Sequence, residues 1–191
     1  MKQFEITSFL ESKFPSTLAS QFDIGKVGLQ FGSKDKQIHK MIIALDATKD
    51  VIDEAIEKKC DLLITHHPFL FFPLLSVDYD SALGKKLLKI FHAKLNIYSM
   101  HTNFDTAFGG MNDILASILN LTNIKAEKEE IDSNCFIRIG EVPQVKLQDY
   151  VSMVNTNLQD FVMRYVGCDE KIITKVGIIG GAGANELNNA I

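Results

Sequence analysis

Two adjacent histidines stand directly after a short apolar run of the chain. The sequence reads THHP at 65–68, and the preceding residues 62–64 are Leu-Leu-Ile, a length and composition typical of a buried strand. Side chains alternate between the two faces of a strand, so His66 and His67 can reach one cleft only beyond the end of that strand. Pro68 indicates irregular backbone at this point. We therefore expect both imidazoles at the carboxyl end of a strand.

A second polar segment, HTNFD at 101–105, follows the apolar run 95–100 in the same way. In open α/β sheets, ligands bind outside the carboxyl ends of the strands, so both segments should open onto one sheet edge. Two other interpretations remain open here. One is that His101 is a core histidine, and the other is that Asp105 is an N-cap before the turn at Gly109.

Imidazole and carboxylate groups together form the ligand set of divalent metals such as zinc, manganese, iron or nickel. The two segments therefore predict a metal site, with His66, His67 and Asp105 as its ligands. The alternative is that the adjacent histidines are polar loop residues that cap the sheet. His39 and His92 lie outside both segments, and we expect them to be solvated.

Two further features are weaker candidates. Asp46 follows the apolar run 41–45, but it could equally cap the helix expected to start near Asp50. The glycine-rich run GIIGGAG at 177–183 favours a tight turn, with anion binding as the alternative. It matches neither the register of a dinucleotide-binding fingerprint nor a P-loop, which requires Lys-Ser or Lys-Thr.

The elements around these residues follow a regular order. Apolar runs of strand length alternate with segments of helical periodicity, which is typical of an α/β protein with parallel strand–helix–strand units. A polar and charged run at 122–134 suggests two α/β lobes, residues 1–125 and an incomplete 126–191. The expected strands are 41–45, 62–64, 95–100, 136–139, 161–166 and 176–179, and the expected helices are 8–14, 49–59, 82–93, 111–119 and 146–157.

Composition narrows the class of protein. Of 191 residues, 46% are hydrophobic and 23% charged, and the formal net charge is −4. The chain therefore lacks the basic surplus that a dedicated nucleic-acid or anionic-membrane surface needs. The N-terminus has no apolar signal-like run, and the three cysteines are scattered without metal-ligand spacing. We expect a globular cytoplasmic protein with reduced thiols.

The two histidine-bearing segments in their wider context resemble a known family. DLLITHHPFLFF at 61–72 and HTNFDTAFGGMND at 101–113 are similar to the NIF-three-like family, also called GTP cyclohydrolase 1 type 2 homologues or dinuclear-metal-centre hexameric proteins. Further similar stretches cover the chain in order, at 15–32, 44–61, 136–142 and 175–187. The resemblance implies paired α/β lobes, assembly as a homohexamer and a two-metal site in each subunit.

The resemblance also implies how the ligands divide. His67 and Asp105 would hold one metal and His66 the other. In the family, a C-terminal His-x-x-x-Glu segment supplies another histidine and a bridging glutamate, and this sequence ends before such a segment. We therefore expect at most one weakly bound divalent cation per chain, near His67 and Asp105, and impaired activity.

Two functions remain open from the sequence, so whether the protein is an enzyme is undecided at this stage. The first is a metal-dependent hydrolase of unknown substrate, with a small phosphorylated compound or nucleotide implied by the family's name. The second is a non-catalytic metal-binding or regulatory scaffold. The fold does not decide between them, because function resides in the site.

Overall fold

The computed structural model describes residues 1–126, 135–159 and 162–186. The chain forms two compact units, Met1–Phe104 and Asp105–Ile191. The division lies earlier in the chain than the polar run that suggested a boundary after residue 125. The reason is packing, because the helix at 111–118 lies against the strands of the second unit.

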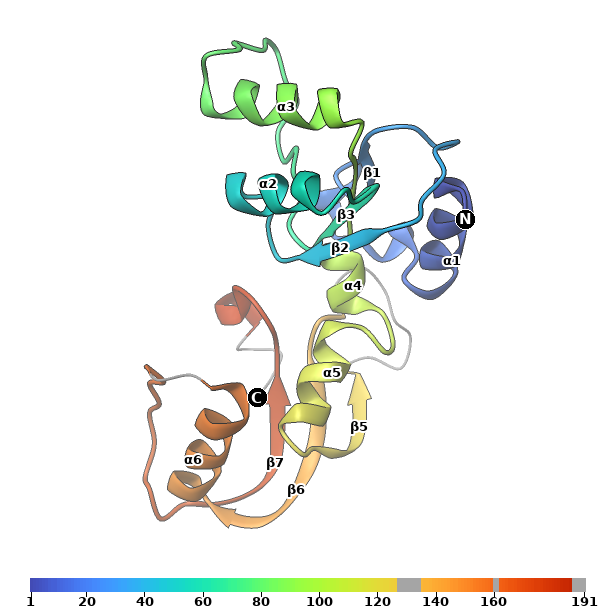
Figure 1. The fold of residues 1–191 in the computed structure, drawn as a ribbon. Helices are drawn as coiled ribbons and strands as arrows, with labels where there is room; N and C mark the ends of the chain where they lie inside the picture. The colour runs from blue at the N-terminus through green and yellow to red at the C-terminus, as the bar shows by residue number, and fades with distance from the viewer. Residues whose placement is uncertain (127–134, 160–161, 187–191) are drawn as a thin grey trace. The chain divides into compact units, whose positions relative to one another are not determined.

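The first unit is built on a four-stranded sheet with the order β1-β4-β3-β2 (Figure 1). Strands β2, β3 and β4 are parallel, as the alternating pattern predicts, and β1 runs antiparallel to β4. The strands are β1 (Gly28–Phe31), β2 (Met41–Ala44), β3 (Leu62–Thr65) and β4 (Asn96–Ser99), and the crossover helices are α2 (Lys49–Glu57) and α3 (Ala82–Ala93). The α/β class with parallel strand–helix units is confirmed.

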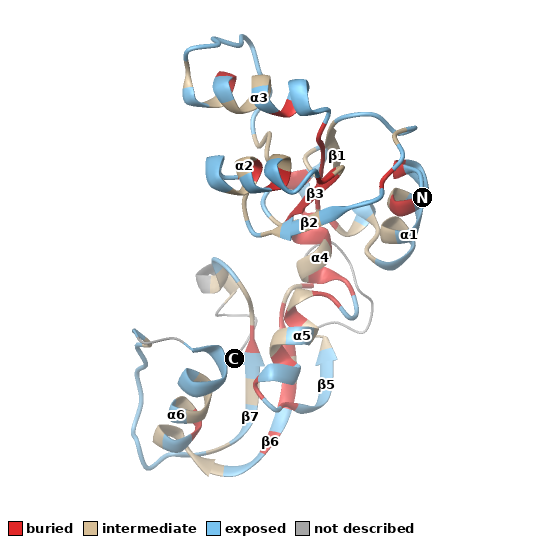
Figure 2. Ribbon diagram, viewed as in Figure 1, coloured by how far each residue is buried: buried red, intermediate tan, exposed pale blue. Residues whose placement is uncertain are grey.

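The crossover helices begin at side-chain caps and pack on one face of this sheet. Thr48 accepts a hydrogen bond from the Val51 backbone at the start of α2, and Ser81 accepts one from Gly84 at the start of α3. Strands β3 and β4 are buried along their whole length, whereas β2 alternates between exposed and half-buried residues. Figure 2 shows the contrast between the buried β3 and the more exposed β2. The central strands are therefore rigidly held, and the residues just beyond their carboxyl ends are well positioned.

Two expectations about the N-terminal part were wrong. Helix α1 (Gln3–Lys13) begins before Ser8, because the Lys2 backbone pairs with Gln37 and its N–H donates to the Glu5 carboxylate. Ser8 and Glu11, whose spacing is typical of a helix start, thus lie inside the helix. Strand β1 was missed altogether, since it lies in a glycine-punctuated stretch and starts at Gly28 with a positive φ of 98°. Two 3₁₀ turns, η1 (Ser16–Leu18) and η2 (Gln21–Asp23), precede it.

The second unit contains a three-stranded antiparallel sheet in the order β5-β6-β7. Its elements are α5 (Met111–Ile118), β5 (Thr122–Ala126), β6 (Arg138–Lys146), α6 (Leu147–Leu158), β7 (Ile172–Ile178) and the short turn η3 (Gly183–Glu186); α4 (Thr102–Thr106) spans the division between the units. The expected strand at 161–166 is wrong for residues 162–166, which form no strand and include the fully exposed Val166. Phe161 lies outside the described residues.

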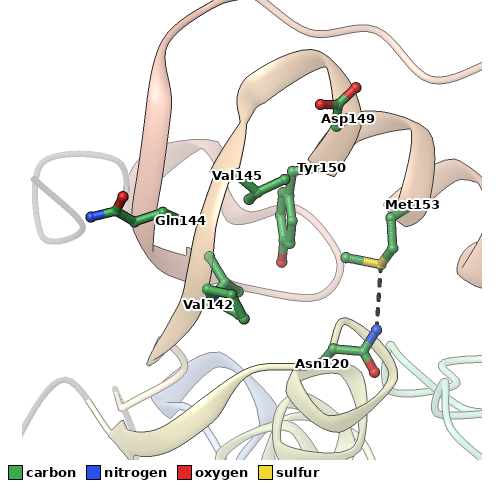
Figure 3. Close-up of a pocket in the computed structure, with 8 residues that line it drawn as sticks. Asn120, Val142, Gln144, Val145, Asp149, Tyr150 and Met153 are labelled. Atoms are coloured by element: carbon green, nitrogen blue, oxygen red, sulfur yellow. Dashed lines mark hydrogen bonds between the residues drawn. The ribbon is translucent and has the colours of Figure 1, made fainter.

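The helix α6 and strand β6 enclose a largely apolar pocket of about 370 Å³ in this unit (Figure 3). Tyr150 points into the unit's core and donates from its hydroxyl to the Leu119 carbonyl, while the Asn120 amide lies against the Met153 sulfur. The glycine run leads into η3. Among the helices in the described ranges, none has the length and apolarity that a bilayer span requires.

A buried arginine ties the second unit together, and its loss should be costly. Arg138 is fully buried, pairs with Asp113 and donates to the carbonyls of Cys135, Thr106 and Ala107. Replacing it with methionine leaves Asp113 without its ion-pair partner and removes the side-chain donor to the Cys135 and Thr106 carbonyls, so Arg138→Met should lower the free energy of unfolding by about 3 kcal/mol or more. Urea denaturation measures this.

The exposed Arg164 provides the matched control. Arg164→Met should change the free energy of unfolding by less than about 0.5 kcal/mol. Equal effects of the two substitutions would show that the Arg138 contacts do not stabilise the unit.

Candidate metal centre

Three histidines gather at the carboxyl edge of the first sheet. His66 and His67 follow β3, and His101 follows β4, so the edge rule brings the two segments together as expected. The backbone N–H groups of His66 and His67 donate to the carbonyls of Ala44 and Leu45, at 3.3 and 3.0 Å. The pairing of β3 with the neighbouring segment thus continues past Thr65 and fixes both histidines.

The three imidazoles form a compact triangle. The ring centroids lie 5.0 Å apart for His66 and His67, 5.1 Å for His66 and His101, and 5.5 Å for His67 and His101. One ring nitrogen from each lies within 4.8 Å of the other two. Nitrogens on a tetrahedral zinc are about 3.3 Å apart, given Zn–N bonds of ~2.0–2.1 Å. Small ring rotations would therefore bring all three onto one cation.

Two carboxylates stand behind this triangle. The Asp23 Oδ2 atom lies 2.6 Å from Nδ1 of His101, and the Asp46 Oδ1 atom lies 2.8 Å from Nδ1 of His67. A carboxylate hydrogen-bonded to Nδ1, as Asp46 is to His67, leaves Nε2 as the ligand atom. His67 is therefore oriented in the manner usual for metal-ligating histidines, and Asp23 stands at the corresponding place beside His101.

The two carboxylates differ in their surroundings. Asp23 is fully buried and also accepts hydrogen bonds from the backbone and hydroxyl of Thr102, at 3.3 and 2.6 Å. The Asp46 side chain is about half exposed, at 49%. Asp23 is consequently fixed by the protein, whereas water competes for Asp46.

Burial keeps the third imidazole neutral. Desolvation, reinforced by the neighbouring His101 and His67, lowers the pKa of His66 to about 4 from an ordinary value of 6.5. Only a neutral imidazole can ligate a metal. His66 is thus held in its ligating form at neutral pH.

This pKa has a consequence for the stability of the metal-free protein. In the unfolded chain His66 binds a proton below its ordinary pKa of 6.5, whereas in the folded chain it binds one only below a pKa of about 4. The contribution of His66 to the free energy of unfolding is therefore fully present above pH 6.5. It falls by roughly 3 kcal/mol as the pH decreases toward 4. Urea denaturation in the presence of a chelator should show wild type losing this advantage over His66→Gln across that window.

The exposed His39 supplies the control for that measurement, because His39→Gln gives the effect of removing a solvated imidazole. A difference between wild type and His66→Gln that does not change with pH would contradict the burial argument.

The structure treats the predicted residues unequally. It brings His66 and His67 together, and it adds His101, for which a core position was the alternative. Asp105 lies in α4 and belongs to the second unit. Its role as a metal ligand stays a prediction from the sequence. Asp105 is not the cap considered as an alternative, because Gly110 precedes α5. His39 and His92 are exposed, as expected.

Two carboxylates of the site were not assigned to it from the sequence. Asp46 was considered as a helix cap, but Thr48 caps α2 and Asp46 pairs with His67. Its place after β2, at the same sheet edge as the histidines, is the signal that could have identified it. Asp23 lies in the turn η2 and carries no periodic signal.

The donor set suits a divalent cation such as zinc, manganese, iron or nickel, since three imidazoles backed by carboxylates are characteristic of such sites.

Comparison with known proteins relates the whole chain to one family. The profile of the family described as Duf34/NIF3 (NGG1p interacting factor 3) matches residues 1–191. The chain belongs to this family.

Several relatives of this family member align along its whole length. A Clostridium perfringens protein named GTP cyclohydrolase 1 type 2 homolog is 34% identical over 193 residues, covering 100% of this chain and 73% of the relative. The crystal structure of Staphylococcus aureus protein SA1388 matches with a TM-score of 0.89 and 26% identity, covering 100% of this chain and 75% of that one. Reduced HcgD from Methanocaldococcus jannaschii matches with a TM-score of 0.77 and 30% identity, covering 96% and 71%.

Proposed function

We propose that the protein binds a divalent metal at the histidine cluster and is a metal-dependent hydrolase. The observation that carries the proposal is the triangle of His66, His67 and His101, whose ligand nitrogens lie within 4.8 Å of one another. The names of the relatives, GTP cyclohydrolase 1 type 2 homologs, support hydrolysis of a nucleotide or another small phosphorylated compound.

Each residue of the site has a distinct part in this proposal. His66, His67 and His101 hold the cation through neutral ring nitrogens, and Asp105 is an additional ligand by resemblance to the family. Asp23 and Asp46 orient the rings of His101 and His67. The cation supplies Lewis acidity for the hydrolysis.

A metal-replacement assay tests the proposal. The purified chain is treated with a chelator, reloaded with Zn²⁺, Mn²⁺, Fe²⁺ or Ni²⁺, and assayed for GTP hydrolysis. We expect activity only after reloading and its loss in His67→Ala, because that substitution removes a ligand. The control is His92→Ala, an exposed histidine on α3.

Two results of this assay contradict different parts of the proposal. Retained metal without hydrolysis of GTP or related phosphorylated compounds favours the non-catalytic scaffold. Absence of retained metal contradicts the metal centre itself.

We infer in addition that the protein self-associates, with the homohexamer as the expected state. Strand β2 forms one edge of the first sheet, and two of its apolar side chains are exposed, Met41 at 45% and Ile43 at 72%. Leu45, just beyond the strand, is 58% exposed. Such an edge favours pairing with another chain. Light scattering should give a mass of about six chains; a stable monomer over a wide concentration range would contradict this inference.

A further inference from the structure

Two loops of the first unit line a pocket of about 340 Å³. One is the turn 24–30, which enters β1, and the other is the loop 70–74. Gly28 pairs with Ser99 at the carboxyl end of β4, and the loop 70–74 follows His67 within a few residues. Both walls of this loop pocket therefore start from the sheet edge that carries the candidate metal centre.

Hydrogen bonds connect the two walls to each other and to the site. The Leu70 backbone donates to the Gln30 side-chain oxygen at 2.7 Å, and the Gln30 amide donates to the Lys26 carbonyl at 2.5 Å. The Lys26 backbone donates to the Asp23 carbonyl at 2.8 Å. Lys26 is thus one turn from the residue that orients His101.

Among the described residues, no carboxylate forms an ion pair with Lys26. Its ammonium lies 3.7 Å from the ring centroid of Phe71 and 5.9 Å from that of Phe72. Within residues 1–126, 135–159 and 162–186, no ion pair involves Lys26 and no acidic side chain lines the pocket. A lysine held on an aromatic face keeps N–H groups available for an anion.

The other wall, the loop 70–74, presents an open aromatic face. Phe72 is 74% exposed and packs edge-on against Phe71, with ring centroids 5.0 Å apart and an interplanar angle of 79°. Planar ligand rings stack on such faces. The pocket volume lies at the lower end of small-molecule sites, which suits a single nucleotide-sized ligand.

We propose that the loop pocket is the recognition subsite of the candidate metal centre and takes a planar ring that carries a phosphate group. Lys26 binds the phosphate, and Phe72 stacks on the ring. This inference rests on the proposed function for the substrate's reacting end, but the two can be tested separately.

Isothermal titration of the full chain as purified provides the test, with GMP, guanosine and inorganic phosphate as probes. GMP should bind more tightly than guanosine or phosphate alone. Lys26→Gln should weaken GMP binding at least about 10-fold, because it removes the charged donor, and should leave guanosine binding unchanged. Phe72→Ala should weaken GMP and guanosine by a similar factor and leave phosphate binding unchanged.

Lys85→Gln, at an exposed position on α3, is the matched control and should bind GMP like wild type. Failure of wild type to bind GMP, or equal affinity in wild type and Lys26→Gln, would overturn the subsite. Metal content measured on the same samples separates the two proposals. Retained metal with no dependence on Lys26 overturns the subsite alone, whereas Lys26-dependent GMP binding without retained metal supports the subsite and contradicts the metal centre.

Discussion

His101→Ala should weaken metal binding by more than about 100-fold, since loss of a ligand exceeds the 10- to 100-fold effect typical of its outer partners. The reason is geometric. His101 closes the triangle with His66 and His67, and its ring is the one held by the fully buried Asp23. Without it, a cation keeps two of the three imidazoles, with Asp105 as the one further proposed ligand, and the closed triangle of nitrogens is lost.

The measurement is a competition titration of Zn²⁺ against a chelator of known affinity. His92→Ala, which removes an exposed histidine outside the cluster, should bind Zn²⁺ like wild type. Urea denaturation of the metal-free variants separates a lost ligand from a lost fold. Unchanged affinity in a folded His101→Ala would mean that the cation is held by other groups.

The outcome for His101 illustrates what a sequence can and cannot predict about such a site. The apolar runs before 66–67 and 101 mark neighbouring strands, and the common edge of parallel strands brings the residues after them together. Local pattern therefore predicted a histidine site at this edge. It left open whether His101 joins the core or the cluster, because that depends on ring orientation, which Asp23 sets from a distant turn.

The positions of residues outside the alternating strands and helices were harder to predict from the sequence. Asp23 and Lys26 belong to 3₁₀ and turn segments before β1, a short antiparallel strand whose first residue has positive φ. Neither periodicity nor capping patterns identify such segments. The strand expected at 161–166 was wrong for residues 162–166 for a different reason. Strand propensity depends on packing against neighbours, and Val162 and Val166 are exposed.

Asp23→Asn should weaken Zn²⁺ binding by about 10- to 100-fold, although Asp23 is not a proposed ligand. Its buried carboxylate lies 2.6 Å from Nδ1 of His101, and a negative charge behind the ring favours a cation bound at Nε2. An amide is close to the same size and still accepts from Thr102, but it lacks that charge. The affinity should fall while the fold is kept.

Asp46→Asn is the matched comparison, because it makes the same change behind His67. The Asp46 side chain is 49% exposed, so water can replace its contact, and the loss should be at most about fivefold, the upper range for an exposed pair. Competition titration with Zn²⁺ measures both variants, and denaturation in chelator checks that each is folded. A loss for Asp46→Asn as large as that for Asp23→Asn would show that burial does not determine how strongly a carboxylate supports its histidine.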